Sequence, residues 1–371
     1  MFRSRTFFPR VAVRRLPQLL VTCASLACVW PVAQGAAAEP TNLHDRLHKL
    51  PFKIAYETYL NDNWEIFVAN ADGSHAVNLT STPEVHEHYP QVSPDGQHIC
   101  FSVDTGEGRE AVRSLWVMDI DGHNRRKLVD NAREPFWSPD SQKVGFLPQE
   151  YPKFNVMDYY TKGMSFYDLK SGKIEPHVNS ANLYHLYNPG YSRNGKWIVS
   201  TVHAGMGVGH AILLIEAQGT NIINLNIPGC RPCFSPDGKQ LAWGAGDHEI
   251  AVAPINLDDP KPAIGTWSLS IHDPTNETYH VDWSPDSRFL SLSRGPASKG
   301  DPNKRGTFQS ACEIVGVYAP GWNIIAVPAD KRGVLELDKA TAAELSPVTT
   351  NGFSNKESAW FAPKASTSPK P

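Results

Sequence analysis

The chain lacks an excess of charge of either sign, since 35 Lys and Arg residues stand against 38 Asp and Glu residues and give a formal net charge of -3. Binding to nucleic acid needs a basic patch or stripe, so this balance argues against nucleic acid as the main partner. Beyond the first forty residues the chain also lacks an apolar run long enough to cross a bilayer. We therefore expect a mature chain without a membrane span.

Several catalytic signatures are missing as well. The sequence contains no G-x-S-x-G, no H-E-x-x-H and no C-x-x-C-H, which are typical of α/β-hydrolases, zinc proteases and c-type haem attachment. Cysteine is scarce, with six residues in all. Cys230 and Cys233 have C-x-x-C spacing, but they fall on an expected strand and not at a helix N-terminus, where a redox pair gains its low thiol pKa. We predict a structural disulfide between them, or two buried thiols.

The N-terminus has the three-part layout of a secretory signal peptide. A cationic segment (MFRSRTFFPRVAVRR) is followed by an apolar one (LPQLLVTCASLACVW) and by small residues (PVAQGAAAEP). We predict a signal peptide over 1–38, a short lead over 39–50 and a periplasmic or secreted protein. The alternative is an uncleaved signal anchor.

What the chain has in abundance is turn residues, with 30 Pro and 27 Gly. The segment YPQVSPDGQHICF (89–101) recurs in five further copies, the last degenerate, which begin EPFWSPD, NPGYSRN, RPCFSPD, HVDWSPD and SAWFAP. Counted from the motif serine, the steps are 45, 54, 43, 49 and 78 residues. A base period in the forties, stretched by insertions, is typical of β-propellers.

Between these copies, apolar and polar residues alternate on both sides of Asp-Gly and similar pairs, as in WEIFVANADGSHAVNLT (64–80). Such patterns predict half-buried strands joined by tight hairpins. Each unit is therefore expected to hold four antiparallel strands, with Ser-Pro-Asp-Gly as the hairpin between the first and second.

The two ends of the mature chain complete one another. FKIAYET (52–58) matches a second strand with no inner strand before it, and SAWFAP (358–363) matches an inner strand with no second strand after it. Pairing them removes two open sheet edges. We predict an all-β, six-bladed propeller over 51–363, closed by N- and C-terminal strands in one blade, with a disordered tail over 364–371, and we expect a monomer.

On these repeats, the chain resembles the TolB-like (WD-like) β-propeller family of exported bacterial proteins. The resemblance covers about residues 51 to 363 and implies the propeller fold with a binding role. Only about a dozen residues separate the predicted cleavage site from the first strand, whereas TolB carries an α/β domain there, so a role in the Tol-Pal system is not expected. The same repeat occurs in oligogalacturonate lyases, whose catalytic metal is held by histidines.

Function is expected on the face that carries the long loops (148–163, 203–210 and 294–322), because binding sites favour such loops. The starts of the inner strands should converge on the central channel, which makes six residues candidates for a binding site at its mouth: His88, Glu134, Tyr187, Arg231, His280 and Glu357. A divalent metal is the alternative occupant, with ligands drawn from His86, His88, His185 and His280.

We therefore predict no cofactor and no catalytic residue, and a binding or scaffold module for a protein partner in the cell envelope or an anionic or carbohydrate ligand. The alternative function is a metal-dependent polysaccharide lyase of the oligogalacturonate type that uses the His-rich channel mouth.

Overall fold

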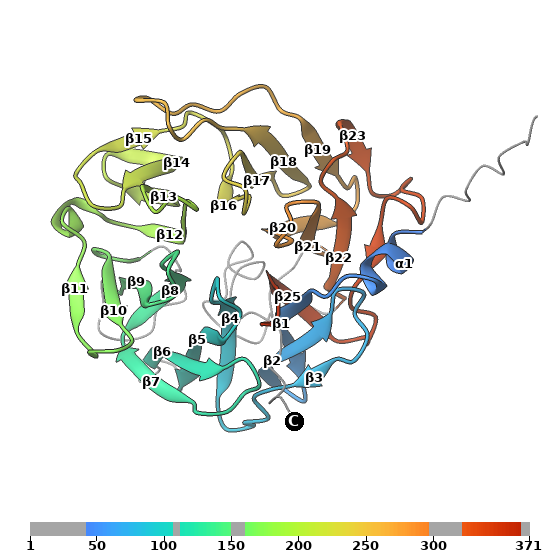
Figure 1. Cartoon of the computed structure of the whole chain (residues 1–371), viewed down its shortest axis with the longest axis horizontal. Coiled ribbons are helices and arrows are strands. Elements are labelled where there is room, and N and C mark those ends of the chain that lie inside the picture. Colours follow the sequence, from blue (N-terminus) through green and yellow to red (C-terminus); the bar gives the residue numbers. More distant parts are fainter. Residues whose placement is uncertain (1–41, 107–111, 150–159, 297–320, 365–371) are drawn as a thin grey trace, which may run out of the picture. The chain divides into compact units, whose positions relative to one another are not determined.

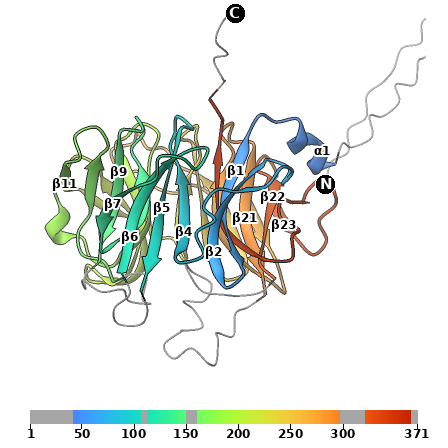
Figure 2. The same ribbon diagram turned by 90° about the horizontal axis from the view of Figure 1, so that it is seen from below.

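The computed structural model describes residues 42–106, 112–149, 160–296 and 321–364. The predicted signal peptide and most of the C-terminal tail lie outside the described residues. Residues from Pro40 onward form one unit, in which six sheets surround a central channel (Figure 1). Figure 2 shows these sheets edge-on, with strands that run from one face of the ring to the other. No described helix has the length and apolar character needed to span a membrane.

Each sheet is one blade and is named here from its innermost strand outward. Blade 1 contains β25 (Ser354–Phe361), β1 (Lys53–Leu60), β2 (Asn63–Asn70) and β3 (Val77–Asn78). Blade 2 contains β4 (His86–Val92), β5 (His98–Thr105), β6 (Val112–Asp119) and β7 (Arg126–Asp130). Blade 3 contains β8 (Ala132–Trp137), β9 (Lys143–Pro148), β10 (Ser165–Asp168) and β11 (Ile174–Pro176).

The remaining blades follow the same order. Blade 4 contains β12 (Leu186–Tyr191), β13 (Trp197–Gly205), β14 (Val208–Glu216) and β15 (Ile222–Asn224). Blade 5 contains β16 (Cys230–Phe234), β17 (Gln240–Gly246), β18 (Glu249–Pro254), β19 (Leu269–His272) and β23 (Gly333–Glu336). Blade 6 contains β20 (Glu277–Trp283), β21 (Phe289–Gly295), β22 (Asn323–Pro328) and β24 (Ser346–Pro347). The six-bladed architecture predicted from the repeats is confirmed.

The repeated Ser-Pro-Asp-Gly segments are the hairpins between first and second strands. In blade 2, Ser93 Oγ donates to Asp95 Oδ1 at 2.6 Å and accepts from the backbone N–H of His98 at 3.0 Å. Gly96 takes a positive φ of 70°, a conformation that glycine adopts without steric cost. The hydroxyl therefore links both ends of the turn, and serines 138, 192, 235 and 284 make the same bond to the Asp or Asn two residues on.

The ends of the chain close the ring in blade 1, as predicted. β1 pairs antiparallel with β25, with Ile54 opposite Trp360 and Lys53 opposite Phe361. Every residue of β25 is buried, so this strand is part of the core and not an added edge.

All six inner strands carry a two-residue β-bulge at equivalent positions, which sequence analysis did not predict. In blade 5, for example, the register shifts between Cys230 and Cys233, so that Arg231 and Pro232 face a single residue of β17. The first residue of each bulge has a φ between 49° and 60°, and these six residues are Tyr89, Glu134, Asn188, Arg231, His280 and Glu357. Four of them precede proline, which suits a bulge because proline has no N–H for the ladder.

Two further elements were not expected. β23 belongs by sequence to the connection between β22 and β24 of blade 6, but it pairs parallel with β19 of blade 5. The helix α1 (Leu43–His48) packs Leu43 and Leu47 into the core beside Phe289 and Ile324 of blade 6. Both elements tie blade 6 to a neighbouring blade.

Candidate functional site in the central channel

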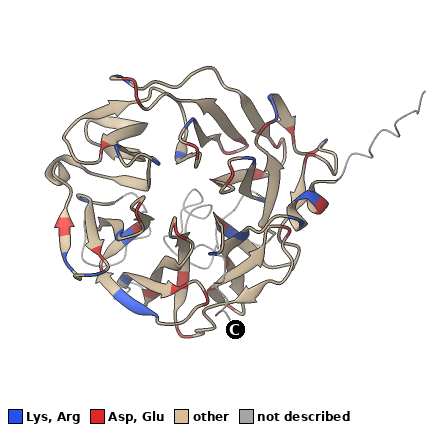
Figure 3. Cartoon of the chain, viewed as in Figure 1, with Lys and Arg blue, Asp and Glu red and all other residues tan. Residues whose placement is uncertain are grey.

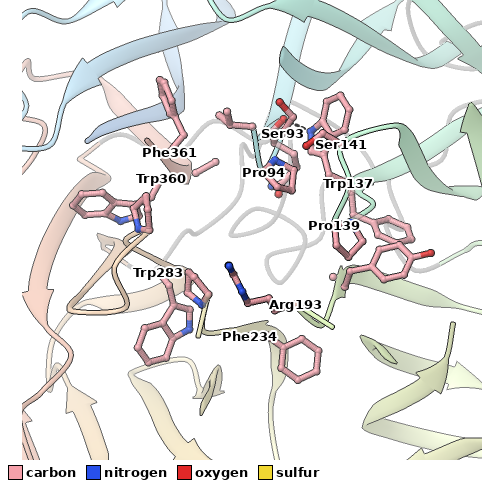
Figure 4. A pocket seen from close by; sticks show the side chains of 18 of the residues that line it. Ser93, Pro94, Trp137, Pro139, Ser141, Arg193, Phe234, Trp283, Trp360 and Phe361 are labelled. Carbon is pink, nitrogen blue, oxygen red and sulfur yellow. Dashed lines mark hydrogen bonds between the residues drawn. The ribbon is translucent and has the colours of Figure 1, made fainter. Parts of the chain in front are cut away.

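The central channel widens into a cavity of about 680 Å³ at the face formed by the Ser-Pro turns. Each blade contributes the end of its inner strand, so the lining repeats around the ring (Figure 4). We call this cavity the funnel. Its wall includes seven aromatic residues, which are Phe136, Trp137, Tyr191, Phe234, Trp283, Trp360 and Phe361. Four prolines of the turns line its rim, namely Pro94, Pro139, Pro236 and Pro285.

Arg193 breaks this pattern. It occupies the turn position at which blades 2, 3, 5 and 6 have proline, and Figure 4 shows its side chain directed toward the middle of the opening. The side chain is exposed and forms no ion pair or side-chain hydrogen bond with any described residue. By contrast, Asp140 is held by its own turn, because Ser138 donates to it at 2.5 Å and this bond lowers its pKa. Arg193 is thus a cation that is available to a ligand.

Asp282 adds a titratable group to the funnel wall. Its Oδ2 accepts from the backbone N–H of Trp360 at 2.7 Å, and its Oδ1 lies 3.3 Å from the Cys233 thiol. Burial raises the pKa of this carboxyl to about 6. The carboxyl therefore joins blades 5, 6 and 1 where they meet at the funnel.

The bulge residues lie one step deeper in the channel. Gln91, Phe136, Gly190, Asp282 and Ala359 line the funnel, and the bulge residues of the same strands precede them by two positions. We call the six bulge residues Tyr89, Glu134, Asn188, Arg231, His280 and Glu357 the channel ring. Figure 3 shows that acidic and basic residues both occur on the inner strands around the channel.

Three members of the ring contact one another across blades 5, 6 and 1. His280 Nε2 lies 2.7 Å from Glu357 Oε1, and Arg231 Nη1 lies 3.6 Å from the same oxygen. All three are buried. Burial raises the pKa of Glu357 well above its usual range, and burial, with the nearby Arg231 and Lys356, lowers that of His280. Both groups are therefore favoured in their neutral forms.

A second polar cluster lies next to the first, in blades 1 and 2. Arg113 donates to both oxygens of Asp104 at 2.6 and 2.5 Å. His88 lies 3.7 Å from Asp104 Oδ2 and 3.7 Å from Glu57 Oε2. Glu57 also accepts from the backbone N–H of Tyr89 at 2.8 Å, which satisfies an amide of the bulge.

The six residues predicted for the channel mouth lie deeper than expected and are buried. Glu134, Arg231, His280 and Glu357 are bulge residues of the ring, whereas His88 and Tyr187 each precede one. Tyr187 packs against the Arg231 guanidinium at 5.7 Å and contacts His210 Nε2 through its hydroxyl at 3.0 Å. The structure thus brings Tyr187, Arg231, His280 and Glu357 together and places His88 in the other cluster.

Sequence reasoning missed several buried charges of the channel, among them Arg113, Arg133 and Lys356. Burial, together with the nearby Arg113, lowers the pKa of Arg133 to about 9. Lys356 lies 4.9 Å from the Trp322 ring. Arg133 and Lys356 each precede a ring residue. The X-Pro pair that marks four of the bulges could have pointed to Arg133, which stands before Glu134-Pro135, but no such pair follows Lys356.

The predicted metal ligands do not form a shared group. His86 and His88 have ring centroids 6.0 Å apart, but His185 bonds to the carbonyl of Ala204 in blade 4 and His280 belongs to the ring. Within the described ranges, no group of three or more His, Cys, Asp or Glu residues is arranged to hold a metal ion.

Cys230 and Cys233 are free thiols on the bulged strand β16. Burial raises the pKa of both thiols, which disfavours the reactive thiolate. A disulfide between them stays a prediction. Of the loops expected to carry function, 150–159 and 297–320 lie outside the described residues, and the funnel opens at the face of the tight turns.

No protein-family model matches the chain, and no curated protein matches it. Among solved structures, TolB from Acinetobacter baumannii is similar over 84% of this chain and 67% of that chain, with a TM-score of 0.55 and 16% identity. A TolB structure from Agrobacterium tumefaciens is similar over 82% of this chain and 91% of that chain, with a TM-score of 0.51 and 14% identity. The chain has a TolB-like β-propeller fold.

The TolB-like propeller also matches an oligogalacturonate lyase in complex with manganese, over 70% of this chain and 78% of that chain, with a TM-score of 0.45 and 14% identity. At these identities the likenesses show the fold alone. What this TolB-like propeller does must be argued from its own channel.

Proposed function

We propose that this TolB-like propeller is an exported binding module that holds a segment of a partner protein of the cell envelope in the funnel. The observation that carries the proposal is the funnel itself, a cavity of about 680 Å³ whose wall is aromatic and whose rim is proline. Aromatic residues give large contact areas at low entropic cost and are enriched at the centres of protein interfaces.

The rigidity of the funnel supports binding. Trp137 Nε1 donates to the carbonyl of Gln91 in blade 2 at 2.8 Å, and Trp283 Nε1 donates to that of Cys233 in blade 5 at 3.2 Å. These bonds cross from one blade to the next and fix the orientation of the indoles. A wall that is already ordered loses little side-chain freedom when a ligand arrives, which favours affinity.

Arg193 supplies a free cation to a wall whose carboxyl groups are already bonded. Those of Asp95 and Asp140 are held within their own turns, and that of Asp282 is held by blades 1 and 5. A guanidinium without a protein partner can donate a pair of hydrogen bonds to a carboxylate or to backbone carbonyls of a bound segment. The same chemistry does not suggest hydrolysis, because the motif serines already donate to the Asp or Asn of their turns.

The test exploits the repeat. Arg193→Pro restores the proline of the other blades in a turn that favours it, so it should remove the cation and leave the fold intact. Lys239→Gln removes an exposed cation from a neighbouring turn outside the funnel lining and serves as the matched control. We expect chemical crosslinking of the full mature chain in envelope extract to capture a protein partner. Calorimetry with the purified partner should then show at least tenfold weaker binding for Arg193→Pro, about 1.4 kcal/mol.

Equal affinity for the wild type and Arg193→Pro, with a Tyr191→Ala variant also unaffected, would exclude the funnel as the binding site. Retention of an oligosaccharide in place of a protein would contradict the partner class. Unchanged affinity of Lys239→Gln is needed for the loss in Arg193→Pro to count as specific.

A further inference from the structure

Arg231 is a buried cation with unused hydrogen-bonding capacity. Its side chain is 2% exposed, and neither Nη1 nor Nη2 hydrogen-bonds to any described residue. Buried polar atoms in proteins nearly always have a partner, and each exception calls for an explanation such as an absent ligand or water. The position of Arg231 within the channel makes a ligand a physical option.

The surrounding residues hold the guanidinium in place. The backbone N–H of Arg231 donates to Thr201 Oγ1 of blade 4 at 2.9 Å, and the guanidinium faces the ring of Tyr187 at 5.7 Å. Its φ of 56° belongs to the bulge, and Pro232 follows it. The side chain is thus fixed from the backbone outward, as a binding group should be.

The charges around Arg231 leave its countercharge incomplete. Glu357 Oε1 lies 3.6 Å from Nη1, too far for a hydrogen bond, and burial favours the protonated form of that carboxyl. Glu134 of blade 3 and Tyr89 of blade 2 also interact electrostatically with the guanidinium, while Lys356 and Arg133 add further positive charge to the channel. A buried charge is costly unless it is paired and hydrogen-bonded.

The geometry points to a carboxylate-binding site in the channel, in which Nη1 and Nη2 of Arg231 together receive one carboxylate group. Planar, two-point recognition of carboxylates is the chemistry for which the guanidinium is best suited. The inference deepens the proposed function and rests on it for the way in which the ligand reaches Arg231. On the strand of Arg231, the funnel lining begins at Phe234, three residues further along. The carboxylate then belongs to the inserted segment, as an acidic side chain or a chain terminus, or to a free small acid.

The test begins with the anion alone. Acetate and formate are titrated into the full mature chain at constant pH and ionic strength, with chloride as the reference salt, and followed by calorimetry and by NMR of arginine side-chain N–H signals. We expect saturable binding at one site and a shift of one guanidinium signal. Arg231→Lys keeps the charge but loses the planar pair of N–H donors, so it should weaken binding at least tenfold. Arg288→Gln removes an exposed arginine and should leave binding unchanged.

A second variant guards against loss of folding at position 231. Glu357→Gln removes the nearest competing carboxyl and keeps its size, so acetate should bind more tightly than to the wild type. Each peptide captured in the funnel is then tested in three versions, with a free C-terminus, with an amidated C-terminus, and with its acidic residues replaced by the corresponding amides. The version that loses affinity shows whether the bound carboxylate is the chain terminus or a side chain.

Three results would overturn the inference. The wild type could fail to bind either acid saturably, or a folded Arg231→Lys variant could bind acetate as tightly as the wild type does. A crystal grown with acetate could also show only water at Arg231. Because acetate needs no partner protein, its binding can succeed when partner capture fails, and the reverse result would leave the funnel proposal standing without this site.

Discussion

Glu87 illustrates how a single buried group should make stability depend on pH. It lies on β4 and is 2% exposed. Thr82 connects it to Glu65 of blade 1, since Thr82 donates its hydroxyl to Glu87 and its backbone N–H to Glu65 Oε1 at 3.0 Å. Burial first, and then the neighbouring Glu65, raise the pKa of Glu87 to about 8.

The sign of the effect follows from proton linkage. Between the ordinary glutamate value of about 4.3 and a folded-state pKa of about 8, the folded chain binds more protons than the unfolded chain. Stability should therefore fall as pH rises through this window, by up to about 1.4 kcal/mol per pH unit from this group. The side chain of Glu87→Gln cannot ionise. The stability of this variant relative to the wild type should therefore increase as the pH rises from about 5 to about 8.

Urea unfolding of both proteins across that range measures the difference in their free energies of unfolding. The titration of all other groups cancels in this difference, because both proteins share those groups. Glu175→Gln is the control, because Glu175 is exposed and pairs with Lys143 at the surface. A gap between the wild type and Glu87→Gln that stays constant with pH would show that Glu87 does not titrate in this window.

At the residue scale, the sequence predicted which residues lie near the channel better than it predicted their contacts with one another. The expectation that the starts of the inner strands converge on the channel led to Glu134, Arg231, His280 and Glu357, because the repeat places equivalent residues at similar depth. The bulges could not be foreseen from alternation alone. An inserted residue reverses which side chains face the channel, so Arg133 and Lys356 were overlooked.

At the element scale, the hairpins were predictable because their signals are local. Pro, Asp and Gly within four positions determine a turn, whatever the rest of the chain does. The strand β23 was not predictable in this way, since its parallel partner β19 lies some sixty residues earlier and no local pattern specifies that pairing. Its two apolar residues differ in burial, with Leu335 in the core and Val334 exposed.

This difference in burial gives a matched pair of substitutions. Leu335→Ala should destabilise the protein by about 2–4 kcal/mol, because Leu335 packs in the core cluster with Leu269 and Ile271. Val334→Ala, at the neighbouring exposed position, should change stability by no more than about 0.5 kcal/mol. Chemical denaturation compares the two, and equal effects would mean that β23 does not anchor blade 6 to blade 5.

At the scale of the whole molecule, closure of the ring was predictable from the two ends of the repeat pattern, although they are some three hundred residues apart. The repeat pattern begins with a second strand that has no inner strand, and it ends with an inner strand that has no second strand. Pairing these two strands is the one arrangement that leaves neither edge open. Closure also assembles the funnel, because Trp360 and Phe361 of β25 complete the wall that blades 2 to 6 begin.

The decisive test of this closure is removal of β25. A chain that ends at Thr349 loses eight buried residues, of which Trp360 and Phe361 alone contribute roughly 5 kcal/mol of burial, against a total stability of about 5–15 kcal/mol for a typical domain. It also exposes the inner edge of β1 to pairing with other chains. We expect this variant to lose its cooperative thermal transition and to aggregate in size-exclusion chromatography.

A chain that ends at Lys364 keeps β25 and should unfold like the wild type, which controls for removal of the tail. Addition of a synthetic peptide of residues 350–364 to the shorter chain should restore part of the folded signal, because the peptide supplies the missing strand in the correct register, with Trp360 opposite Ile54. If the chain that ends at Thr349 remained a monomer with an unchanged midpoint, blade 1 would not depend on the C-terminal strand. The funnel would then have to be stable with five complete walls and one open side.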